Sequence, residues 1–321
     1  IRLSLVGSEM CIRDRYKNGR CEMEWFENFW AIYSNLVLSL GTNALLALSI
    51  WLTLSCGMLA MANAAFMGLG AYTASILTLN YEVPFPLALA GGMALPALVA
   101  FVMGKPTLRL SGVYLAMATL AFGEVVRIVA LNAESLTGGA LGLNGIPQLT
   151  EWWHVLLAVV VVVAVLWRLR ISRIGRAFEA IKEDETAAGL MGIDVGGHKM
   201  LAFVLGAVIA GLAGALNAHL TFFIGPNEYG FDRGVEILTM AILGGITSLI
   251  GPIVGSTLLT LLPEVLRSFA DFRLVVNGLI LVLIVLFLPK GIWDPARLRA
   301  WFGSKRAVPA AAAKSTQGGA A

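Results

Sequence analysis

Long apolar runs separated by short polar connections dominate the chain. They fall at about 30–54, 57–79, 86–104, 113–131, 153–168, 200–220, 235–249, 250–262 and 274–289. A bilayer core of about 30 Å takes roughly 20 apolar residues per helical span, and backbone groups in lipid must be hydrogen-bonded within the segment. The pattern therefore predicts an all-α polytopic membrane protein with about 8–10 transmembrane or re-entrant helices.

The apolar stretch 235–262 is interrupted in its middle. The sequence there, GGITSLIGP over 244–252, contains glycines and a proline that favour a turn. A turn at this place divides the stretch into two half-length segments that enter the membrane and return. We therefore expect a broken or re-entrant hairpin rather than one long span.

Basic residues divide the connections into two groups. The linkers 104–112 and 168–199 and the C-terminal tail hold most of the cations: Lys105, Arg109, Arg168, Arg170, Arg173, Arg176, Lys182, Lys199, Lys290, Arg297, Arg299, Lys305, Arg306 and Lys314. The connections 80–86, 132–152, 221–234 and 263–273 hold only Arg233, Arg267 and Arg273. By the positive-inside rule, the first group faces the cytoplasm and the second faces outward.

A charged segment over 175–194, GRAFEAIKEDETAAGLMGID, lies within the second basic linker. Its apolar residues recur at spacings of three, seven and three: Phe178, Ile181, Ala188 and Met191. This predicts one amphipathic helix over 175–192, which Gly192 can end as a left-handed cap. A helix of this kind between two spans either docks its apolar stripe in a groove of another protein or lies solvated at the membrane surface.

Five blocks of the chain resemble the permeases of branched-chain amino acid ABC importers, the LivM type. They are NAAFMGLGAYTASIL (63–77), LRLSGVYLAMATLAFGEVVRIV (108–129), SLTGGALGLNGIP (135–147), EDETAAGLMGID (183–194) and AILGGITSLIGPIVGS (241–256). The resemblance extends from about residue 35 to 292. It departs at Asn63, where that family often has a histidine, and the family often has a further leading span.

This resemblance implies a function for the charged segment and for the whole chain. The segment matches the coupling helix that an ATPase receives, through Arg176, Phe178, Glu179, Ile181, Glu183, Asp184, Glu185, Ala187, Ala188 and Gly192. The implied partners are a homologous permease subunit, two cytoplasmic ATPase subunits that bind ATP and Mg²⁺, and an extracytoplasmic substrate-binding protein. The implied process is import of branched-chain or related amino acids across a bacterial inner (cytoplasmic) membrane.

Polar residues of the predicted spans and glycines of one outer connection are candidates for the translocation pathway. They are Asn63, Thr119, Glu124, Thr137, Gly138, Gly139 and Asn217. Glu124 lies three residues before Arg127, so the two can neutralise each other on one helix face. We expect this pair to stabilise the fold more than to touch substrate. The glycine-rich connection 135–147 either lines the outer mouth, meets a substrate-delivery protein or caps a turn.

Small residues at intervals of four mark the run 200–220. Gly206, Ala210 and Gly214 would share one face of a helix. Such a face lets two helices approach closely, either within one subunit or across a dimer.

The chain has no motif for catalysis, for metal binding or for nucleic acid. No Gly-Lys-Ser/Thr sequence of a phosphate-binding loop occurs, so ATP hydrolysis is expected in partner subunits and no cofactor in this chain. The histidines and cysteines are scattered without metal-ligand spacing: His154, His198, His219, Cys11, Cys21 and Cys56. Basic residues follow one face of the membrane rather than a nucleic-acid surface, and no catalytic cluster is evident.

Three other functions compete with the import of branched-chain amino acids. An ABC permease for urea, short amides or other amino acids would have much the same sequence. An ion-coupled secondary transporter would need paired carboxylates near the membrane midplane, whereas Glu124 is the only carboxylate well inside a predicted span. A structural membrane subunit without transport is the third.

Composition and patterning predict three regions along the chain. Hydrophobic residues make up 58% of it and the mean hydropathy is +0.81, above the apolar share of about half in soluble domains. We expect a non-native or unstructured segment over 1–22 and a transmembrane permease domain over 23–303, with the coupling loop at about 169–199. A disordered cytoplasmic tail over 304–321 is expected to follow.

Overall fold

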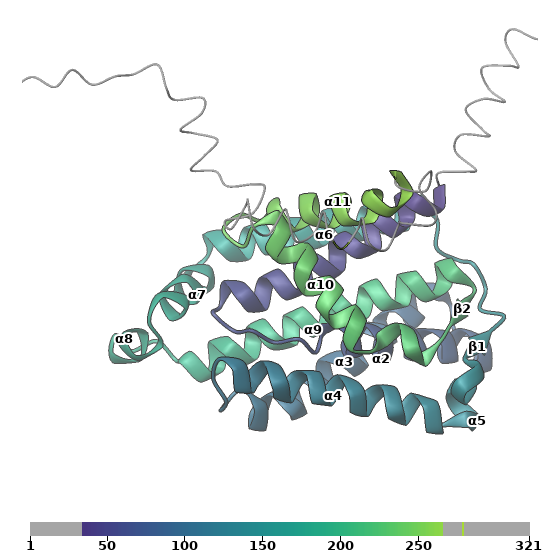
Figure 1. The fold of residues 1–321 in the computed structure, drawn as a ribbon, viewed down its shortest axis with the longest axis horizontal. Helices are drawn as coiled ribbons and strands as arrows, with labels where there is room; N and C mark the ends of the chain where they lie inside the picture. The colour runs from purple at the N-terminus through teal and green to yellow at the C-terminus, as the bar shows by residue number, and fades with distance from the viewer. Residues whose placement is uncertain (1–33, 266–277, 279–321) are drawn as a thin grey trace, which may run out of the picture.

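The computed structural model describes residues 34–265 and Gly278, which form a bundle of long helices (Figure 1). The first helix is Ser34–Ser55. The elements after it are α2 (Asn63–Asn80), α3 (Phe85–Thr107), α4 (Val113–Asn132), α5 (Glu134–Thr137), η1 (Gly139–Leu141), β1 (Leu143–Asn144), α6 (Trp152–Ile171), α7 (Arg173–Glu183), α8 (Glu185–Leu190), α9 (Val195–Thr221), β2 (Phe223–Ile224), η2 (Pro226–Tyr229), α10 (Phe231–Gly244) and α11 (Gly251–Val265).

Five of the described helices are long and apolar enough to cross a membrane. They are the first helix, α3, α4, α6 and α9. The 18-residue α2 and the shorter α10 and α11 are the other apolar helices of the described chain. The chain is therefore an all-α, multi-pass membrane protein, as its hydrophobic pattern predicts. The run expected at 274–289 lies, apart from Gly278, outside the described residues, as do the segments 1–22 and 304–321.

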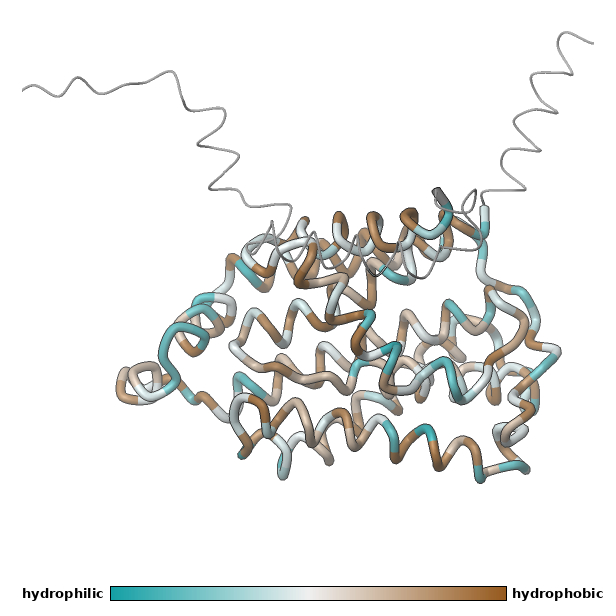
Figure 2. Tube along the Cα trace, in the orientation of Figure 1, coloured by the Kyte–Doolittle hydropathy of each residue, from teal (hydrophilic) through white to brown (hydrophobic). Residues whose placement is uncertain are grey.

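The membrane helices differ in how much of their surface the rest of the chain covers. In their most apolar stretches, 72% of the first helix and 61% of α9 is buried, against 22% of α4 and of α6. The exposed side chains of α4 and α6 are nonetheless large and apolar, as at Met117, Val129, Leu156 and Val160. Brown, apolar segments accordingly continue along these outer helices in Figure 2. Apolar side chains on an outer surface suit contact with lipid, while the first helix, α2 and α9 form the core.

Small residues bring the core helices into backbone contact. A Cβ atom on Gly214 of α9 would overlap the Met67 carbonyl oxygen of α2, and one on Gly70 of α2 would overlap the backbone of Gly211. The Cβ position of Gly206 lies 3.1 Å from the Ser49 carbonyl oxygen of the first helix. The small-residue face expected on α9 is thus confirmed, and it packs within this subunit.

The α10–α11 pair is the hairpin that the sequence predicts over 235–262. α10 ends at Gly244, and Gly245 follows with a φ of 106°, which turns the chain back. A Cβ atom on Gly244 would overlap the Gly251 carbonyl oxygen, and one on Gly255 would overlap that of Met240. The glycines therefore allow the two half-length helices to pack at backbone distance.

One apolar run is helical over less of its length than expected. The run at 57–79 becomes helical only at Asn63, so its expected beginning is corrected. Gly57 has a φ of 77°, a left-handed conformation that ends the first helix. The Gly57 Cβ position lies 3.1 Å from the Lys182 Cα atom, and the Met61 backbone N–H donates to the Thr119 hydroxyl at 3.0 Å. These contacts hold 56–62 as a connection.

The connections gather at two ends of the bundle (Figure 1). The basic end carries the connection 108–112 and the loop 172–194, including α7 and α8. The β-ribbon end carries α5 and the antiparallel pair β1–β2, in which Leu143 lies opposite Ile224. The two internal linkers rich in lysine and arginine thus share one end, as the charge pattern predicts. The third basic segment, the tail, lies outside the described residues.

Candidate coupling site at the basic end

The loop between α6 and α9 forms two short helices, so the prediction of one helix over 175–192 is wrong. Asp184 separates α7 from α8 in an extended conformation, with φ −154° and ψ 113°. Its carboxylate accepts hydrogen bonds from the Thr186 and Ala187 backbone N–H groups at 2.8 and 3.0 Å. This N-cap requires Asp184 to leave the helical conformation, which explains the break. The Thr186 hydroxyl also donates to Asp184, and these hydrogen bonds hold the pKa of Asp184 below its ordinary value.

The apolar stripe of the loop faces the bundle of its own chain. Phe178 is 2% exposed, and Ile181 and Ala188 are each 4% exposed. All three belong to the main hydrophobic core, so they anchor α7 and α8 to the membrane helices. This corrects the expectation that the whole stripe is presented to another protein. Its fourth member, Met191, is 83% exposed.

Three further features fix the position of the loop. A Cβ atom on Gly175 would overlap the Arg170 carbonyl oxygen, so the α6–α7 corner needs glycine. The Lys199 ammonium of α9 lies 2.6 Å from a Glu185 carboxylate oxygen of α8, with the Lys199 side chain only 9% exposed. Gly192 has a φ of 82° and follows the end of α8, in agreement with the predicted left-handed cap.

The end of α8 presents an apolar pair to solvent. Leu190 is 89% exposed and Met191 is 83% exposed. Among the described elements at the basic end, α8 projects farthest from the bundle (Figure 1). Other predicted coupling residues of α7 and α8 also have exposed side chains: Arg176, Glu179, Glu183, Glu185 and Ala187. Neighbouring apolar side chains in a polar loop mark an interaction site. Sequence reasoning did not single out Leu190, although its position next to Met191 and before Gly192 was a usable signal.

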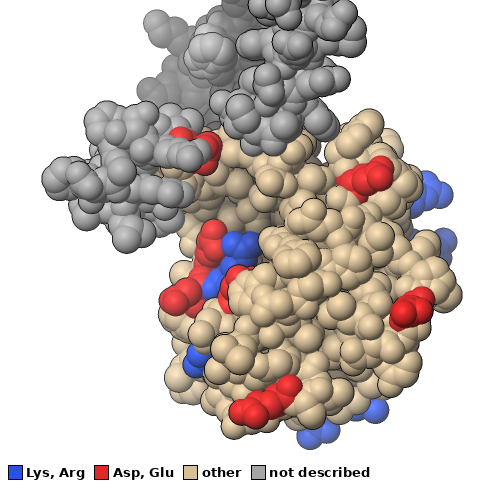
Figure 3. All heavy atoms as spheres, turned by 90° about the vertical axis from the view of Figure 1, so that its right-hand side faces the viewer, with Lys and Arg blue, Asp and Glu red and all other residues tan. Residues whose placement is uncertain are grey.

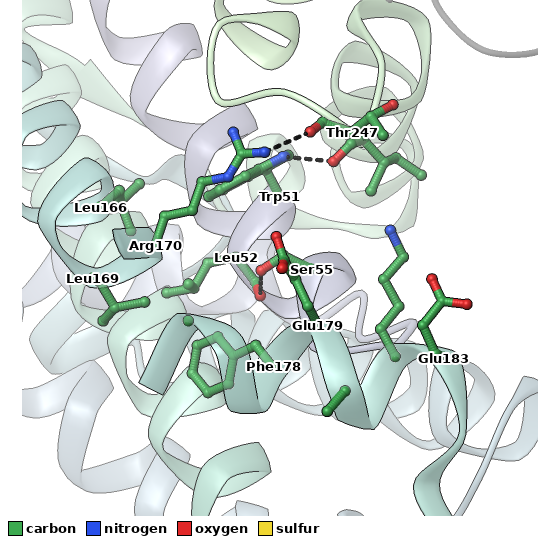
Figure 4. Close-up of a pocket in the computed structure, with 14 residues that line it drawn as sticks. Trp51, Leu52, Ser55, Leu166, Leu169, Arg170, Phe178, Glu179, Glu183 and Thr247 are labelled. Carbon is green, nitrogen blue, oxygen red and sulfur yellow. Dashed lines mark hydrogen bonds between the residues drawn. The ribbon is translucent and has the colours of Figure 1, made fainter. Parts of the chain in front are cut away.

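A cavity separates α7 from the turn of the α10–α11 hairpin. It has a volume of about 420 Å³ and is lined by the first helix, α6, α7 and the turn. Figure 4 shows Trp51 and Arg170 reaching across its upper edge to the turn. Trp51 donates to the Ile246 carbonyl oxygen at 2.9 Å, and Arg170 donates to that of Thr247 at 3.2 Å. The hairpin turn is therefore held by hydrogen bonds at the edge of this cavity.

The Glu124–Arg127 pair joins α4 to the region around α10. The Arg127 Nε atom lies 2.8 Å from a Glu124 carboxylate oxygen, which confirms the predicted neutralisation. The other Glu124 oxygen accepts the Phe231 backbone N–H at 3.0 Å, and Arg127 donates to the Asn227 side-chain oxygen at 3.0 Å. Phe231 is the first residue of α10, so its N–H group has no partner within the helix. Glu124 thus caps α10 from a neighbouring helix. Its negative charge also interacts favourably with the positive end of the α10 dipole.

Two pathway candidates are buried between helices. The Asn63 side chain is 2% exposed and donates to the Ser49 hydroxyl of the first helix at 2.7 Å. Thr119 is 1% exposed, and its hydroxyl accepts from Met61 and donates to carbonyl groups within α4. Both residues connect the beginning of α2 to its neighbours, so their geometry supports a structural role.

Comparison with known proteins bears on the whole described bundle. Residues 32–288 match the model of the family described as "Branched-chain amino acid transport system / permease component". The chain belongs to this family of permeases.

Curated relatives agree with this assignment. The permease is 33% identical over 298 residues to the high-affinity branched-chain amino acid transport system permease protein LivM of Escherichia coli, a match that covers 82% of this chain and 68% of that protein. It is 36% identical over 126 residues to LivH of the same organism, covering 39% and 41% of the two chains. It is also 31% identical over 140 residues to the autoinducer 2 import system permease protein LsrC of Yersinia pseudotuberculosis, covering 41% and 40%. No solved structure matches the chain significantly.

The glycine-rich connection of the permease folds as a compact cap. Thr137 is 8% exposed, and its hydroxyl donates to the Ala130 and Ala133 carbonyl oxygens and can accept the Gly139 backbone N–H. Gly138 ends α5 in the left-handed conformation, and a Cβ atom there would overlap the Gly142 carbonyl oxygen. This arrangement supports the capping alternative for Thr137, Gly138 and Gly139.

Asn217 is the pathway candidate that reaches a cavity. It lies near the end of α9 and contributes to a space of about 390 Å³ at the β-ribbon end. This polar cavity is lined by Met67, Asn217, Asn227, Glu228, Asp232, Arg233 and Glu236. Figure 3 looks onto this end of the molecule, where basic and acidic side chains gather in one cluster. Sequence reasoning missed the four charged residues, because they lie in a connection and in the first turns of α10.

Proposed function

We propose that this permease is a membrane-spanning subunit of a bacterial ABC importer for branched-chain amino acids. It works with a homologous permease subunit, two cytoplasmic ATPase subunits and an extracytoplasmic substrate-binding protein in the inner membrane. ATP and Mg²⁺ bind to the ATPases, and this chain carries no cofactor. The substrate class is supported by the LivM relatives of Escherichia coli and Salmonella typhimurium, each of which aligns with 82% of the chain.

The coupling loop carries the mechanistic part of this proposal. Its backbone is fixed by the Asp184 cap, the Glu185–Lys199 ion pair and the buried Phe178, and yet its end exposes Leu190 and Met191. A rigid projection with an apolar tip can enter a groove of another protein and transmit force from it. The basic end is cytoplasmic by its charge, so the partner there is an ATPase subunit.

Movement of the loop has two routes into the membrane domain. The Glu185–Lys199 ion pair links α8 to α9, which packs at backbone distance against α2. α7 touches Gly57 after the first helix and borders the cavity below the hairpin turn. Closure of the ATPases would therefore shift the core helices together, while the space beside α7 lets the hairpin move relative to them.

Uptake by a reconstituted importer tests the proposed function. The permease is co-expressed with its candidate permease partner, ATPases and binding protein, and uptake of radiolabelled L-leucine into proteoliposomes is measured. We expect uptake that requires ATP and the binding protein, and that unlabelled isoleucine and valine inhibit. Uptake inhibited by urea or acetamide but not by isoleucine would contradict the substrate class. Uptake driven by an ion gradient without ATP would contradict the importer class.

A further inference from the structure

The polar cavity at the β-ribbon end carries an excess of negative charge. Three carboxylates and one guanidinium line it. Arg233 is held by Glu236 at 2.6 Å and by the Asn43 side-chain oxygen at 2.7 Å. Glu228 and Asp232 have no cation within ion-pair distance among the described residues. The Glu228 side chain remains accessible to solvent, but surrounding protein desolvates it and raises the pKa of its carboxyl, against the lowering effect of Arg233.

Hydrogen-bonding groups beside these carboxylates remain available for a ligand. Arg233 has five N–H donors, and only two of its nitrogen atoms are engaged in the contacts above. The Asn227 side-chain oxygen accepts from Arg127, which leaves its NH₂ group to donate elsewhere.

Two buried tyrosine hydroxyls also lack a partner among the described residues, although neither tyrosine lines the cavity. Tyr72 is 8% exposed and Tyr229 is 2% exposed, and neither hydroxyl has a hydrogen-bond partner in the described chain. Both lie within electrostatic reach of the Glu228 carboxylate. Buried polar groups are rarely left unpaired in a native protein, so these hydroxyls mark unused hydrogen-bonding capacity in the protein near Glu228, outside the cavity lining.

The carboxylates and the free hydrogen-bond donors of the cavity together favour one class of small solute over others. An anion would be repelled by the unpaired carboxylates, and a simple cation would leave the Arg233 and Asn227 donors unused. A zwitterion with adjacent ammonium and carboxylate groups meets both requirements. The volume of about 390 Å³ lies in the range of small-ligand sites, and Met67 provides an apolar wall.

We propose that the polar cavity is a subsite for a zwitterionic amino acid that enters the permease. Its α-ammonium group lies between Glu228 and Asp232, and its α-carboxylate accepts from Arg233 and Asn227. The inference rests on the proposed function and assigns the contacts through which the substrate class is received. Glu124 and Arg127 of α4 form hydrogen bonds with α10 and η2, the elements that carry the subsite residues. This pair therefore helps to position the subsite without lining it.

Cysteine labelling at Asn217 tests the subsite without requiring transport. Asn217→Cys is introduced into the full chain with Cys11→Ser and Cys21→Ser, while the buried Cys56 is retained. Modification rates are compared for a cationic ethylammonium and an anionic ethylsulfonate methanethiosulfonate reagent. Leu141→Cys in the same background is the matched control, because Leu141 is 82% exposed at the same end but does not line the cavity.

We expect the cation-to-anion rate ratio at position 217 to exceed that at position 141 by about tenfold, because a charged cleft concentrates counter-ions. Adding Glu228→Gln and Asp232→Asn should remove this excess. L-Leucine should slow labelling at 217 but not at 141, whereas 4-methyl-2-oxopentanoate, which lacks the ammonium group, should not. Equal rate ratios at the two positions, no protection by leucine, or equal protection by the oxo acid would each overturn the subsite.

The outcome can be separated from that of the uptake experiment. If the permease imports leucine but leucine fails to protect position 217, the subsite is wrong and the proposed function stands. If the reconstituted importer carries no branched-chain amino acid while labelling keeps its charge preference, the substrate class is wrong, and protection by leucine is expected to be absent as well.

Discussion

The two ends of the bundle use charged residues in opposite ways. At the basic end, the Asp184 cap and the Glu185–Lys199 pair fix the backbone of the loop, and its exposed tip is apolar. At the β-ribbon end, glycines and Thr137 fix the backbone, and carboxylates remain unpaired in a cavity. Polar groups paired within the protein hold a shape, whereas these exposed carboxylates of the cavity are free to bind a solute. This contrast is what the proposed coupling at the basic end and the proposed subsite at the β-ribbon end require.

The largest effect on this comparison is expected from Gly175→Val. Its side chain would overlap the Arg170 carbonyl oxygen at the α6–α7 corner, so α7 must swing away from the bundle. We expect leucine-dependent ATPase stimulation to fall about tenfold, because overpacking a buried site costs about 1–3 kcal/mol and here displaces the loop. Gly196→Ala, in the first turn of α9 with no close neighbour, is the control and should leave stimulation unchanged. Normal stimulation in Gly175→Val would show that the loop does not need this corner.

A smaller effect is expected at the other end from Glu124→Ala. The change removes the cap of α10 and the partner of Arg127, which should lower the free energy of unfolding by about 1–2 kcal/mol. Urea denaturation in detergent, followed by circular dichroism, measures this loss. ATPase co-purification should persist. A Glu124→Ala protein that unfolds at the same urea concentration as wild type would contradict the structural role of Glu124.

Glu185→Gln should loosen the coupling loop without unfolding the bundle. It leaves the nearly buried Lys199 ammonium without its anion, but Glu185 is itself about half exposed, so solvent screens part of the interaction. We expect about 1 kcal/mol of local destabilisation, which limited proteolysis would detect as cleavage within 172–194 several-fold faster than in wild type. Exchanging the charges, with Glu185→Lys and Lys199→Glu together, should restore part of the protection. Equal cleavage rates in all three proteins would contradict the role of the pair.

The smallest predicted effect is a pKa change at Asp184. The pKa of Asp184 is lowered in the folded loop, so its cap stabilises the loop fully at pH values above the ordinary carboxyl pKa. This stabilisation is lost as the pH falls through the lowered pKa. Thr186→Val removes the hydroxyl donor and should move the Asp184 pKa towards its ordinary value, as followed by carboxyl-labelled NMR. Thr221→Val, a substitution far from Asp184, should leave it unchanged. An unaltered pKa in Thr186→Val would show that its hydroxyl is not the main cause.

The hydrophobic pattern predicted the architecture because the features that determine each helix lie within its own segment of sequence. Span length, the turn at 244–252 and the small residues of α9 are local properties that lipid and backbone chemistry restrict to few outcomes. The basic linkers likewise predicted which connections share an end. Residues 56–62 were harder, because their contacts with Lys182 and Thr119 bring together distant parts of the chain.

The functional surfaces depended on choices that the sequence alone leaves open. The residues on either side of Asp184 favour a continuous helix. The helix is interrupted only because the Asp184 side chain caps α8. The amphipathic stripe at Phe178 correctly marked a buried face, but periodicity does not tell whether the chain itself or a partner buries it. Glu228 and Arg233 lie in a connection and in α10, and their shared cavity with Asn217 exists only after α9 and η2 meet.

Co-purification of the Leu190→Asp, Met191→Asp double variant with the candidate ATPases tests the central claim most directly. Leu141→Asp, an equally exposed apolar position at the β-ribbon end, is the matched control. The account predicts that the double variant folds normally but loses the ATPases, while the control retains them and supports leucine uptake. Full retention of the ATPases and of uptake by the double variant would show that the tip of α8 is not the coupling surface.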